Sequence, residues 1–364
     1  MSLSAGIVGL PNVGKSTIFN AITAAGAESA NYPFCTIEPN VGIVDVPDER
    51  LATINRFIET QKVLPASVKI VDIAGLVAGA SQGEGLGNKF LGNIKETDAI
   101  LHVVRCFEDS DIVHVHGTVD PKADIEVIEL ELALADIETL NKAHDRVSKK
   151  ARSGDKEAIA ERDSIEKART YLEDGTPLRA ADLSERDHEH LRPLFLITIK
   201  PVLYVANVAE DDLNGDSPFV GAVREHAVAS GSEVIVLCGS IEGEIAGMEP
   251  AEQQEFLGEY GLTEPGLDRL AKKTYALLGL QTFFTAGEKE IRAWTIQQGW
   301  TAPKSAGVIH TDFEKLFIRA EVYSVEDLVE HETEAAIKAA GKLRVEGRDY
   351  EMAEGDVCHF LIGK

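Results

Sequence analysis

Two stretches of the chain alternate short apolar runs with segments of helical periodicity. Apolar runs of strand length lie at 3–8, 41–46, 68–73 and 99–104, and again at 202–207 and 234–238. Helical patterns follow several of them, near 15–22, 49–58, 218–229 and 267–278. Strands that alternate with helices build a parallel sheet wrapped by helices. The pattern therefore predicts the α/β fold class with a mostly parallel sheet.

The alternation stops between 124 and 198, where the sequence is helical and rich in charge. A break at 153–155 divides this stretch, which is typical of a long helical hairpin inserted into an α/β domain. Basic side chains gather near the break, at Arg146, Lys149, Lys150, Arg152 and Lys156. Lysines and arginines on a hairpin are often only a solvated face, but a cluster of them stands out in an acidic chain.

The pattern changes again beyond 279. Apolar runs at 282–285 and 291–296 predict paired strands joined by a turn at Gly287, and a last strand is expected near 357–361. We therefore expect a small C-terminal α+β domain. The predicted organisation has three parts: a discontinuous nucleotide-binding domain at 1–123 and 199–279, the helical hairpin insertion at 124–198, and the C-terminal domain at 280–364.

Composition narrows the classes of function. The 364 residues carry a formal net charge of −25, which argues against a surface that coats nucleic acid but allows a local basic patch. The four cysteines, Cys35, Cys106, Cys238 and Cys358, are scattered and predict neither a zinc site nor a disulfide framework. No apolar run approaches the length of a membrane span. We expect a cytoplasmic protein that does not enter a membrane.

The most informative segment is residues 9–17, GLPNVGKST, which fits the phosphate-binding pattern G-x-x-x-x-G-K-[ST]. Glycines at 9 and 14 allow backbone conformations that a side chain would forbid. Backbone N–H groups and the start of the following helix can then surround a phosphate. Lys15 can reach the β- and γ-phosphates as a catalytic cation, and the Ser16 hydroxyl can bind Mg²⁺. The expected phosphate-binding residues are Asn12, Val13, Gly14, Lys15, Ser16 and Thr17.

Two further positions complete a predicted Mg²⁺ site. Asp72 ends a strand and begins the pattern D-x-x-G with Gly75, where the carboxylate can hold Mg²⁺ and the Gly75 N–H can sense the γ-phosphate. Thr36 lies in the stretch before the second strand and can complete the metal shell in a switch loop. The expected metal ligands are therefore Ser16, Thr36 and Asp72.

The base-binding signature departs from that of a GTPase. The usual N-K-x-D motif is replaced by Asn207, Val208, Ala209 and Glu210, so the lysine and the guanine-binding aspartate are both missing. Glutamate is one methylene longer than aspartate and does not reproduce its paired hydrogen bonds to guanine. We expect Asn207, Val208 and Glu210 to line a base pocket without guanine specificity, and Ser240 to form its far wall.

These motifs together resemble the Obg-like ATPase (YchF) family of P-loop proteins. The resemblance rests on 9–17, on the segment NYPFCTIEPN at 31–40, on DIAGL at 72–76 and on the Asn207–Glu210 replacement, and it extends over essentially the whole chain. It implies a preference for ATP over GTP, and binding to the ribosome and its large subunit. It also implies a C-terminal domain of TGS-like β-grasp type, and it offers rRNA phosphates as partners for Arg146, Lys149, Lys150 and Arg152.

The resemblance also bears on the rate of hydrolysis. It places the apolar Leu76 where Ras-like GTPases carry a glutamine that positions water, which implies slow intrinsic hydrolysis. It assigns the missing role to a histidine in a loop, matched here by His114, although a solvent-facing His114 beside the sheet is almost equally compatible with the sequence. Asn12 stands where related proteins use asparagine to help hold K⁺.

The leading hypothesis is a slow, Mg²⁺-dependent ATPase whose nucleotide state changes its contacts with the ribosome. K⁺ held by Asn12 is a second candidate cofactor. One alternative is a ribosome-binding scaffold that is ordered by ATP and turns over negligibly. Another is a GTPase of the Obg type. We expect a monomer, although the sequence has no direct signal for its oligomeric state.

Overall fold

The computed structural model describes residues 3–26, 40–73, 86–115 and 117–363. The chain divides into two compact units. Unit 1 comprises residues 1–43 and 69–270, and unit 2 comprises residues 44–68 and 271–364. The sequence did not predict that 44–68 would leave the first unit and pack with the C-terminal part of the chain.

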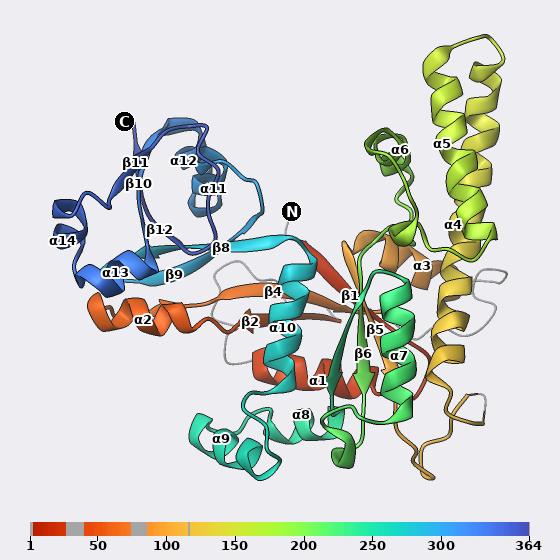
Figure 1. Ribbon diagram of the computed structural model, residues 1–364, viewed down its shortest axis with the longest axis horizontal. Coiled ribbons are helices and arrows are strands. Elements are labelled where there is room, and N and C mark those ends of the chain that lie inside the picture. The colour runs from red at the N-terminus through yellow and green to blue at the C-terminus, as the bar shows by residue number, and fades with distance from the viewer. Residues whose placement is uncertain (1–2, 27–39, 74–85, 116, 364) are drawn as a thin grey trace. The chain divides into compact units, whose positions relative to one another are not determined.

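Unit 1 is built on a six-stranded sheet with the order β2-β4-β1-β5-β6-β7 (Figure 1). The pairings of β1 with β4 and β5, of β5 with β6 and of β6 with β7 are parallel, as the alternating pattern predicted. The strands are β1 (Ser4–Val8), β2 (Val41–Val46), β4 (Ala66–Asp72), β5 (Ala99–Arg105), β6 (Val202–Asn207) and β7 (Glu233–Leu237). Strands β1, β5 and β6 are buried along their whole length, which explains their uninterrupted apolar sequence.

Helices cover both faces of this sheet. Helix α4 (Pro121–Ala151) packs against β5, and α7 packs against β6 and β7. Helix α3 lies beside α4 on the same side of the sheet (Figure 1), where Nζ of its Lys95 donates to Oγ1 of Thr139 at 3.2 Å. The helices of this unit are α1 (Lys15–Gly26), α3 (Leu86–Glu96), α7 (Pro218–Ala229), α8 (Gly239–Ile245) and α9 (Pro250–Glu259), and α10 (Gly266–Leu277) leads into unit 2. A short 3₁₀ turn, η4 (Glu210–Asp212), follows β6. The carboxyl ends of β1, β5 and β6 all open on the loops that carry the predicted motifs.

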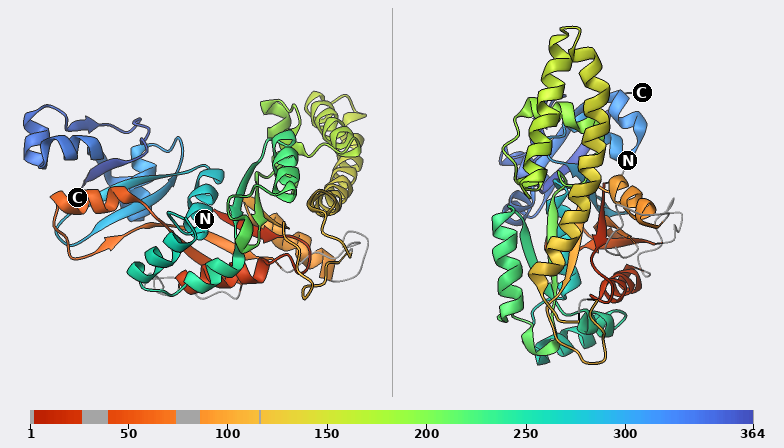
Figure 2. Two further views of the ribbon diagram at one scale, coloured as in Figure 1. Left: turned by 60° about the horizontal axis from the view of Figure 1, so that its bottom comes forward. Right: turned by 90° about the vertical axis from the view of Figure 1, so that its right-hand side faces the viewer.

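The predicted helical hairpin is formed by α4 (Pro121–Ala151) and α5 (Lys156–Glu173), which run side by side (Figure 2). Asp120 caps the first helix and Asp155 the second. An apolar core between them contains Leu140, Val147 and Ile165. The return to the sheet passes through η2 (Leu178–Ala180), α6 (Glu185–Leu191) and η3 (Arg192–Leu194). Arg146, Lys149, Lys150 and Arg152 are all exposed around the end of the hairpin.

Unit 2 contains a second six-stranded sheet with the order β11-β10-β12-β8-β9-β3. The predicted antiparallel pair is present as β8 (Leu280–Ala286) and β9 (Ile291–Gln297). The other strands are β3 (Val63–Leu64), β10 (Phe317–Ser324), β11 (Arg344–Glu346) and β12 (Asp356–Ile362). The helices are α2 (Glu49–Phe57), α11 (Ala302–Ile309), α12 (Thr311–Leu316), α13 (Val325–His331) and α14 (Glu334–Ala339). Phe283, Phe317 and Phe360 lie in the core of this α+β domain.

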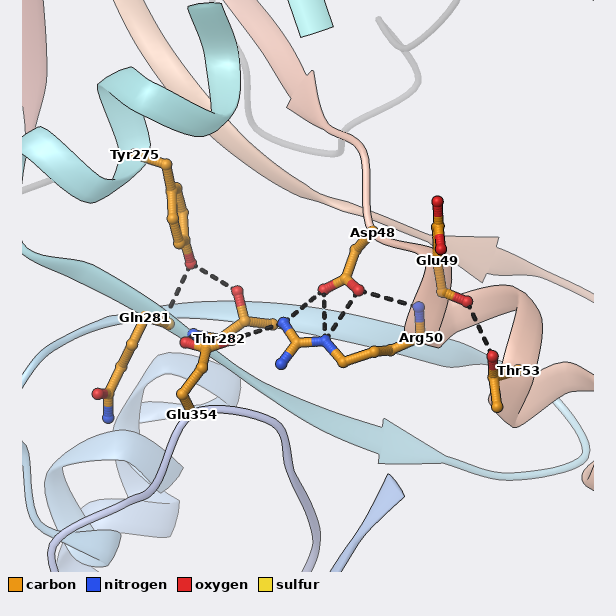
Figure 3. Close-up of polar contacts among 8 residues, drawn as sticks. All are labelled: Asp48, Glu49, Arg50, Thr53, Tyr275, Gln281, Thr282 and Glu354. Carbon is orange, nitrogen blue, oxygen red and sulfur yellow. Dashed lines mark hydrogen bonds and ion pairs between the residues drawn. The ribbon is translucent and has the colours of Figure 1, made fainter. Parts of the chain in front are cut away.

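An ionic cluster joins the excursion 44–68 to the rest of unit 2 (Figure 3). The Arg50 guanidinium donates to the Asp48 carboxylate at 2.7 Å and to Glu354 at 2.5 Å. It also lies 5.0 Å from the centre of the Phe284 ring. Glu354 accepts in turn from the backbone N–H of Thr282 at 2.8 Å, so one arginine ties α2 to β8 and to the segment before β12.

Candidate functional site

The phosphate-binding segment connects β1 to α1. Its backbone takes positive φ at Gly9 (154°), Asn12 (62°) and Gly14 (96°). A Cβ on Gly9 would lie 2.5 Å from the Val103 carbonyl oxygen, and one on Gly14 would lie 2.2 Å from Nδ2 of Asn207, so both glycines are required by close approach. The first turn of α1 has no acidic residue, which leaves its positive end available to an anion.

Lys15 is largely buried at the start of α1. Its side-chain nitrogen donates to the carbonyl oxygen of Leu10 at 2.6 Å. Burial lowers the pKa of Lys15 to about 8, and the neighbouring Asp72 acts in the opposite direction. Burial likewise raises the pKa of Asp72, with Lys15 opposing the shift. The lysine is therefore held close to the strand end that carries the predicted metal ligand.

The available donors fit a magnesium ion in type. Ser16 is exposed at the start of α1, and Asp72 is half-buried at the end of β4, so a hydroxyl and a carboxylate are offered beside the P-loop. Hard oxygen donors, completed by waters and phosphates, are what Mg²⁺ prefers. The predicted partners Thr36 and Gly75 lie outside the described residues, as does Leu76. Within the described residues, no group of three or more His, Cys, Asp or Glu side chains is arranged to hold a metal by itself.

Asn207 links two of the loops around the site. Its Nδ2 donates to the Val13 carbonyl oxygen at 3.0 Å, and its Oδ1 accepts from the Gly239 N–H at 2.9 Å. The side chain is 4% exposed, so these bonds are shielded from water. Asn207 therefore fixes the P-loop to the loop after β7, and both polar ends of its amide are used within the protein.

A cavity of about 880 Å³ opens over these loops. Ser240 lies on its wall, with Oγ 3.0 Å from Sγ of Cys238 and 3.5 Å from Oε1 of Glu210. Val13 is buried beneath the loop and is absent from the lining. Nine of the predicted residues line the cavity together: Asn12, Gly14, Lys15, Ser16, Thr17, Asn207, Val208, Glu210 and Ser240.

His114 does not line this cavity. Its side chain is 5% exposed, and Nε2 lies 2.9 Å from a carboxylate oxygen of Asp124 in the first turn of α4. The solvent-facing position that the sequence left open is thus not the one adopted. Asn12 reaches the same loop, because its Nδ2 donates to the Val113 carbonyl oxygen at 3.2 Å.

Sequence reasoning missed the wall of the cavity after β5. Phe107, Glu108, Asp109 and Ile112 line it, and the buried Arg105 supports them. The only signal was a charged residue at the end of an otherwise apolar strand, which indicates a buried cation with partners nearby. Asp124 was also missed, because the sequence gives no reason to pair it with a histidine ten positions earlier.

Comparisons with known proteins agree over the full length of the chain. A family model described as "50S ribosome-binding GTPase" matches residues 4–145. A model for the C-terminal part of YchF GTPases, described as "Protein of unknown function (DUF933)", matches residues 280–363. The "Ribosome-binding ATPase YchF" of Escherichia coli O157:H7 is 54% identical over 362 residues, covering 100% of this chain and 99% of its own.

The chain belongs to the YchF family. The relative from Bacillus subtilis (strain 168), with the same name, is also 54% identical and covers 99% of both chains. A solved structure, "Structure of the Schizosaccharomyces pombe YchF GTPase", is 38% identical with a TM-score of 0.89, covering 99% of this chain and 98% of that one. Since YchF relatives carry both ATPase and GTPase in their names, the preferred base has to be argued from the site. Of the helices described here, none has the length and apolarity needed to cross a membrane.

Proposed function

We propose that this protein is a Mg²⁺-dependent ATPase that binds the ribosome. The observation that supports this most strongly is the joint lining of one cavity by the P-loop and by the segment Val208–Glu210. The relatives from Escherichia coli and Bacillus subtilis are named ribosome-binding ATPases, which agrees with it. In this proposal Lys15 and the start of α1 hold the phosphates, and Ser16, Asp72 and Thr36 hold the metal.

The preference for ATP rests on what surrounds the base. Val208 stands where a guanine site has lysine, and its side chain is buried. Glu210 stands where the guanine-binding aspartate belongs, at the start of η4 and within reach of Ser240. Asn207 uses its amide to join two loops, so its side chain is held at the edge of the base pocket. A carboxylate that is one methylene longer does not place its two oxygens for the paired hydrogen bonds of guanine, and the pocket then loses its discrimination for guanine.

The proposed chemistry depends mainly on positioning and charge. Bound Mg²⁺ would neutralise charge that develops on the transferred phosphoryl group. Lys15 orients the β- and γ-phosphates, and Gly75 contacts the γ-phosphate. Leu76 cannot orient water, so turnover is slow, and His114 supplies that role from its loop. Asn12 helps to hold K⁺ near the phosphates, and equal rates in Na⁺ and K⁺ buffers would contradict this part.

Competition binding and single-turnover hydrolysis test the nucleotide preference. The affinity for ATP should exceed that for GTP, and ATP hydrolysis should require Mg²⁺ and increase when ribosomes are added. Tighter binding of GTP would favour the Obg-type GTPase. ATP binding with a near-zero rate both with and without ribosomes would favour the scaffold.

The hairpin end is proposed as the contact with rRNA phosphates, because four exposed basic residues gather there in a chain with a net charge of −25. Replacing Lys149, Lys150 and Arg152 with Ala should weaken co-sedimentation with large subunits and flatten its salt dependence. A matched control replaces Lys122, Lys142 and Lys167, which lie on the same two helices and are paired with carboxylates. If both triple variants lost co-sedimentation to the same extent, the loss would come from the change in net charge and not from the hairpin end.

The remaining parts of the proposal are organisational. We propose the three-part division at 1–123 with 199–279, 124–198 and 280–364, in which residues 44–68 pack with the last part, and a TGS-like assignment of that part. Because ribosomes are cytoplasmic, we propose that the protein acts in the cytoplasm. We also propose that it acts as a monomer. Light scattering at working concentrations would contradict the last point if it gave twice the chain mass.

A further inference from the structure

The loop between β5 and α4 is held by one buried arginine. Arg105, at the end of β5, is 1% exposed. Its guanidinium donates to the carbonyl oxygens of Phe107 at 3.1 Å, Ile112 at 3.0 Å and Asp109 at 3.3 Å. Three backbone acceptors on one cation fix the first half of this loop against the sheet, so the wall of the nucleotide cavity has a defined shape.

The second half of the same loop carries His114 away from that wall. The Gly117 N–H donates to the His114 carbonyl oxygen at 3.1 Å, and Gly117 has a φ of 81°, which turns the chain. The imidazole is directed to Asp124 on α4, and both side chains are almost completely buried. In this arrangement Nε2 is occupied by a carboxylate, and His114 is absent from the residues that line the cavity.

We propose that Asp124 is a positioning residue that holds His114 in reserve, out of the nucleotide cavity, until the loop is released. The proposal rests on the proposed function, in which His114 assists hydrolysis. A carboxylate on Asp124 competes for the imidazole with the γ-phosphate and its attacking water. The imidazole that contacts Asp124 does not line the cavity, so it has to leave this contact to reach the γ-phosphate, and the two positions of His114 exclude each other.

Helix α4 connects this contact to the hairpin end. It is a continuous helix of 31 residues with Asp124 in its first turn and Lys149 and Lys150 in its last. At a rise of about 1.5 Å per residue, Asp124 and Lys149 lie roughly 38 Å apart along one element. A ribosome bound at the basic end therefore acts on the same helix that holds His114. Ribosome-stimulated hydrolysis then has a physical route, which is a shift of α4 that loosens the Asp124 contact.

The test compares Asp124→Asn and Asp124→Ala with the wild-type protein in ATP hydrolysis with and without ribosomes. Both variants should raise the ribosome-free kcat several-fold, with little change in KM for ATP, and should reduce the additional stimulation by ribosomes. The matched control is Asp120→Ala. Asp120 caps the same helix by accepting from the Ala123 N–H at 3.1 Å, whereas the carboxylate that contacts His114 is that of Asp124. The control should leave the ribosome-free kcat unchanged.

Variants of His114 separate this inference from the proposed function. His114→Ala should lower the ribosome-stimulated rate, and the double variant His114→Ala/Asp124→Ala should show no gain over it. A normal rate in His114→Ala overturns both the role of His114 and the reserve position. A lowered rate in His114→Ala, combined with an unchanged or lowered ribosome-free rate in Asp124→Asn, overturns the reserve position alone. Asp124→Asn preserves the side-chain shape, so the test survives if Asp124→Ala fails to fold.

Discussion

The side-chain nitrogen of Asn207 lies 3.0 Å from the carbonyl oxygen of Val13, and both groups are buried at the base of the nucleotide cavity. Through this bond the end of β6 sets the conformation of a loop almost two hundred residues earlier in the chain. The P-loop is thus shaped by tertiary contact as well as by its glycines.

Replacing Asn207 should therefore weaken nucleotide binding without touching a phosphate ligand. Asn207→Ala leaves the Val13 carbonyl and the Gly239 N–H unpaired, at a cost of about 1–3 kcal/mol for each group. We expect at least about tenfold weaker ATP binding and a lower unfolding temperature. Asn207→Asp keeps the acceptor for Gly239 and should be intermediate. Calorimetric titration measures the affinity, and an unchanged value in both variants would contradict the bracing role.

The pKa of Lys15, lowered to about 8 by burial, predicts pH-dependent binding. Phosphates bind the protonated lysine and raise its pKa. The affinity for ATP should therefore be full below about pH 8, and should fall by up to about tenfold per unit as the pH rises above it. Titration at pH 8.5 in buffers of different ionisation enthalpy should show proton uptake. Lys15→Arg, which stays charged, should bind less well but with a flat pH profile.

Changing the base pocket should shift selectivity. The double variant Val208→Lys/Glu210→Asp restores the two residue types of a guanine site and should raise the ratio of GTP to ATP affinity by about tenfold or more. Competition binding with both nucleotides measures the ratio. The neighbouring Asp211, which also lines the cavity, provides the control Asp211→Asn, for which no change is expected. An unaltered ratio in the double variant would show that other groups select the base.

His102 should make the protein sensitive to acid. This buried residue on β5 has its pKa lowered to about 3 by burial, from an ordinary value of 6.5. Between these values the unfolded chain binds a proton that the folded protein excludes, so stability falls as the pH decreases from about 6.5 towards 3. At pH 5 the loss of folding stability that is caused by His102 is about 2 kcal/mol.

Glu129 adds to this trend below about pH 4.5. Burial opposes the shift, but bonds from His226, Arg179 and Tyr204 lower the pKa of Glu129 to about 2. Its stabilisation is therefore lost between about pH 4.5 and 2.

Urea unfolding of His102→Gln should show a shallower loss of stability between pH 6.5 and 5 than the wild-type protein. The exposed His188, changed to Gln as a control, should leave the slope unaltered.

The Arg50 cluster in unit 2 gives a stability prediction. Arg50→Ala removes the bonds to Asp48 and Glu354 and the contact with Phe284, and should destabilise this unit by about 1–3 kcal/mol. Arg50→Lys keeps the charge but not the fork of donors, so it should recover only part of the loss. Hydrogen exchange of α2 and β8 amides measures the effect. Equal protection in all three proteins would mean that apolar packing alone holds α2.

Local sequence patterns were enough to predict much of the architecture. The apolar runs that became β1, β5 and β6 are buried along their length, so their sequences are unambiguous. The P-loop was predictable because its glycine spacing follows from close backbone approach. The hairpin was predictable because its two long helices have their own caps and core.

The features that the sequence did not predict depend on contacts with residues elsewhere in the chain. Strand β3 has only two residues and pairs with β9, where Val63 aligns with Ile291. A strand of two residues has no local periodicity that could predict it. Because β3 lies within 44–68, the packing of this segment in unit 2 was not predicted either. Arg105 and Asp124 were missed for the same reason, since an arginine becomes a loop anchor only when three carbonyl groups converge on it.

The excursion also constrains how the protein can be made. Helix α2 buries Leu51 and Ile54, and it packs against β9 and α13, which come from the last part of the chain. During synthesis α2 leaves the ribosome early and keeps an apolar face uncovered until translation is almost complete. Cutting the chain near residue 280 would leave that face permanently exposed, so the nucleotide-binding half is not a separable fragment, and its nascent form needs protection from aggregation until the C-terminus is released.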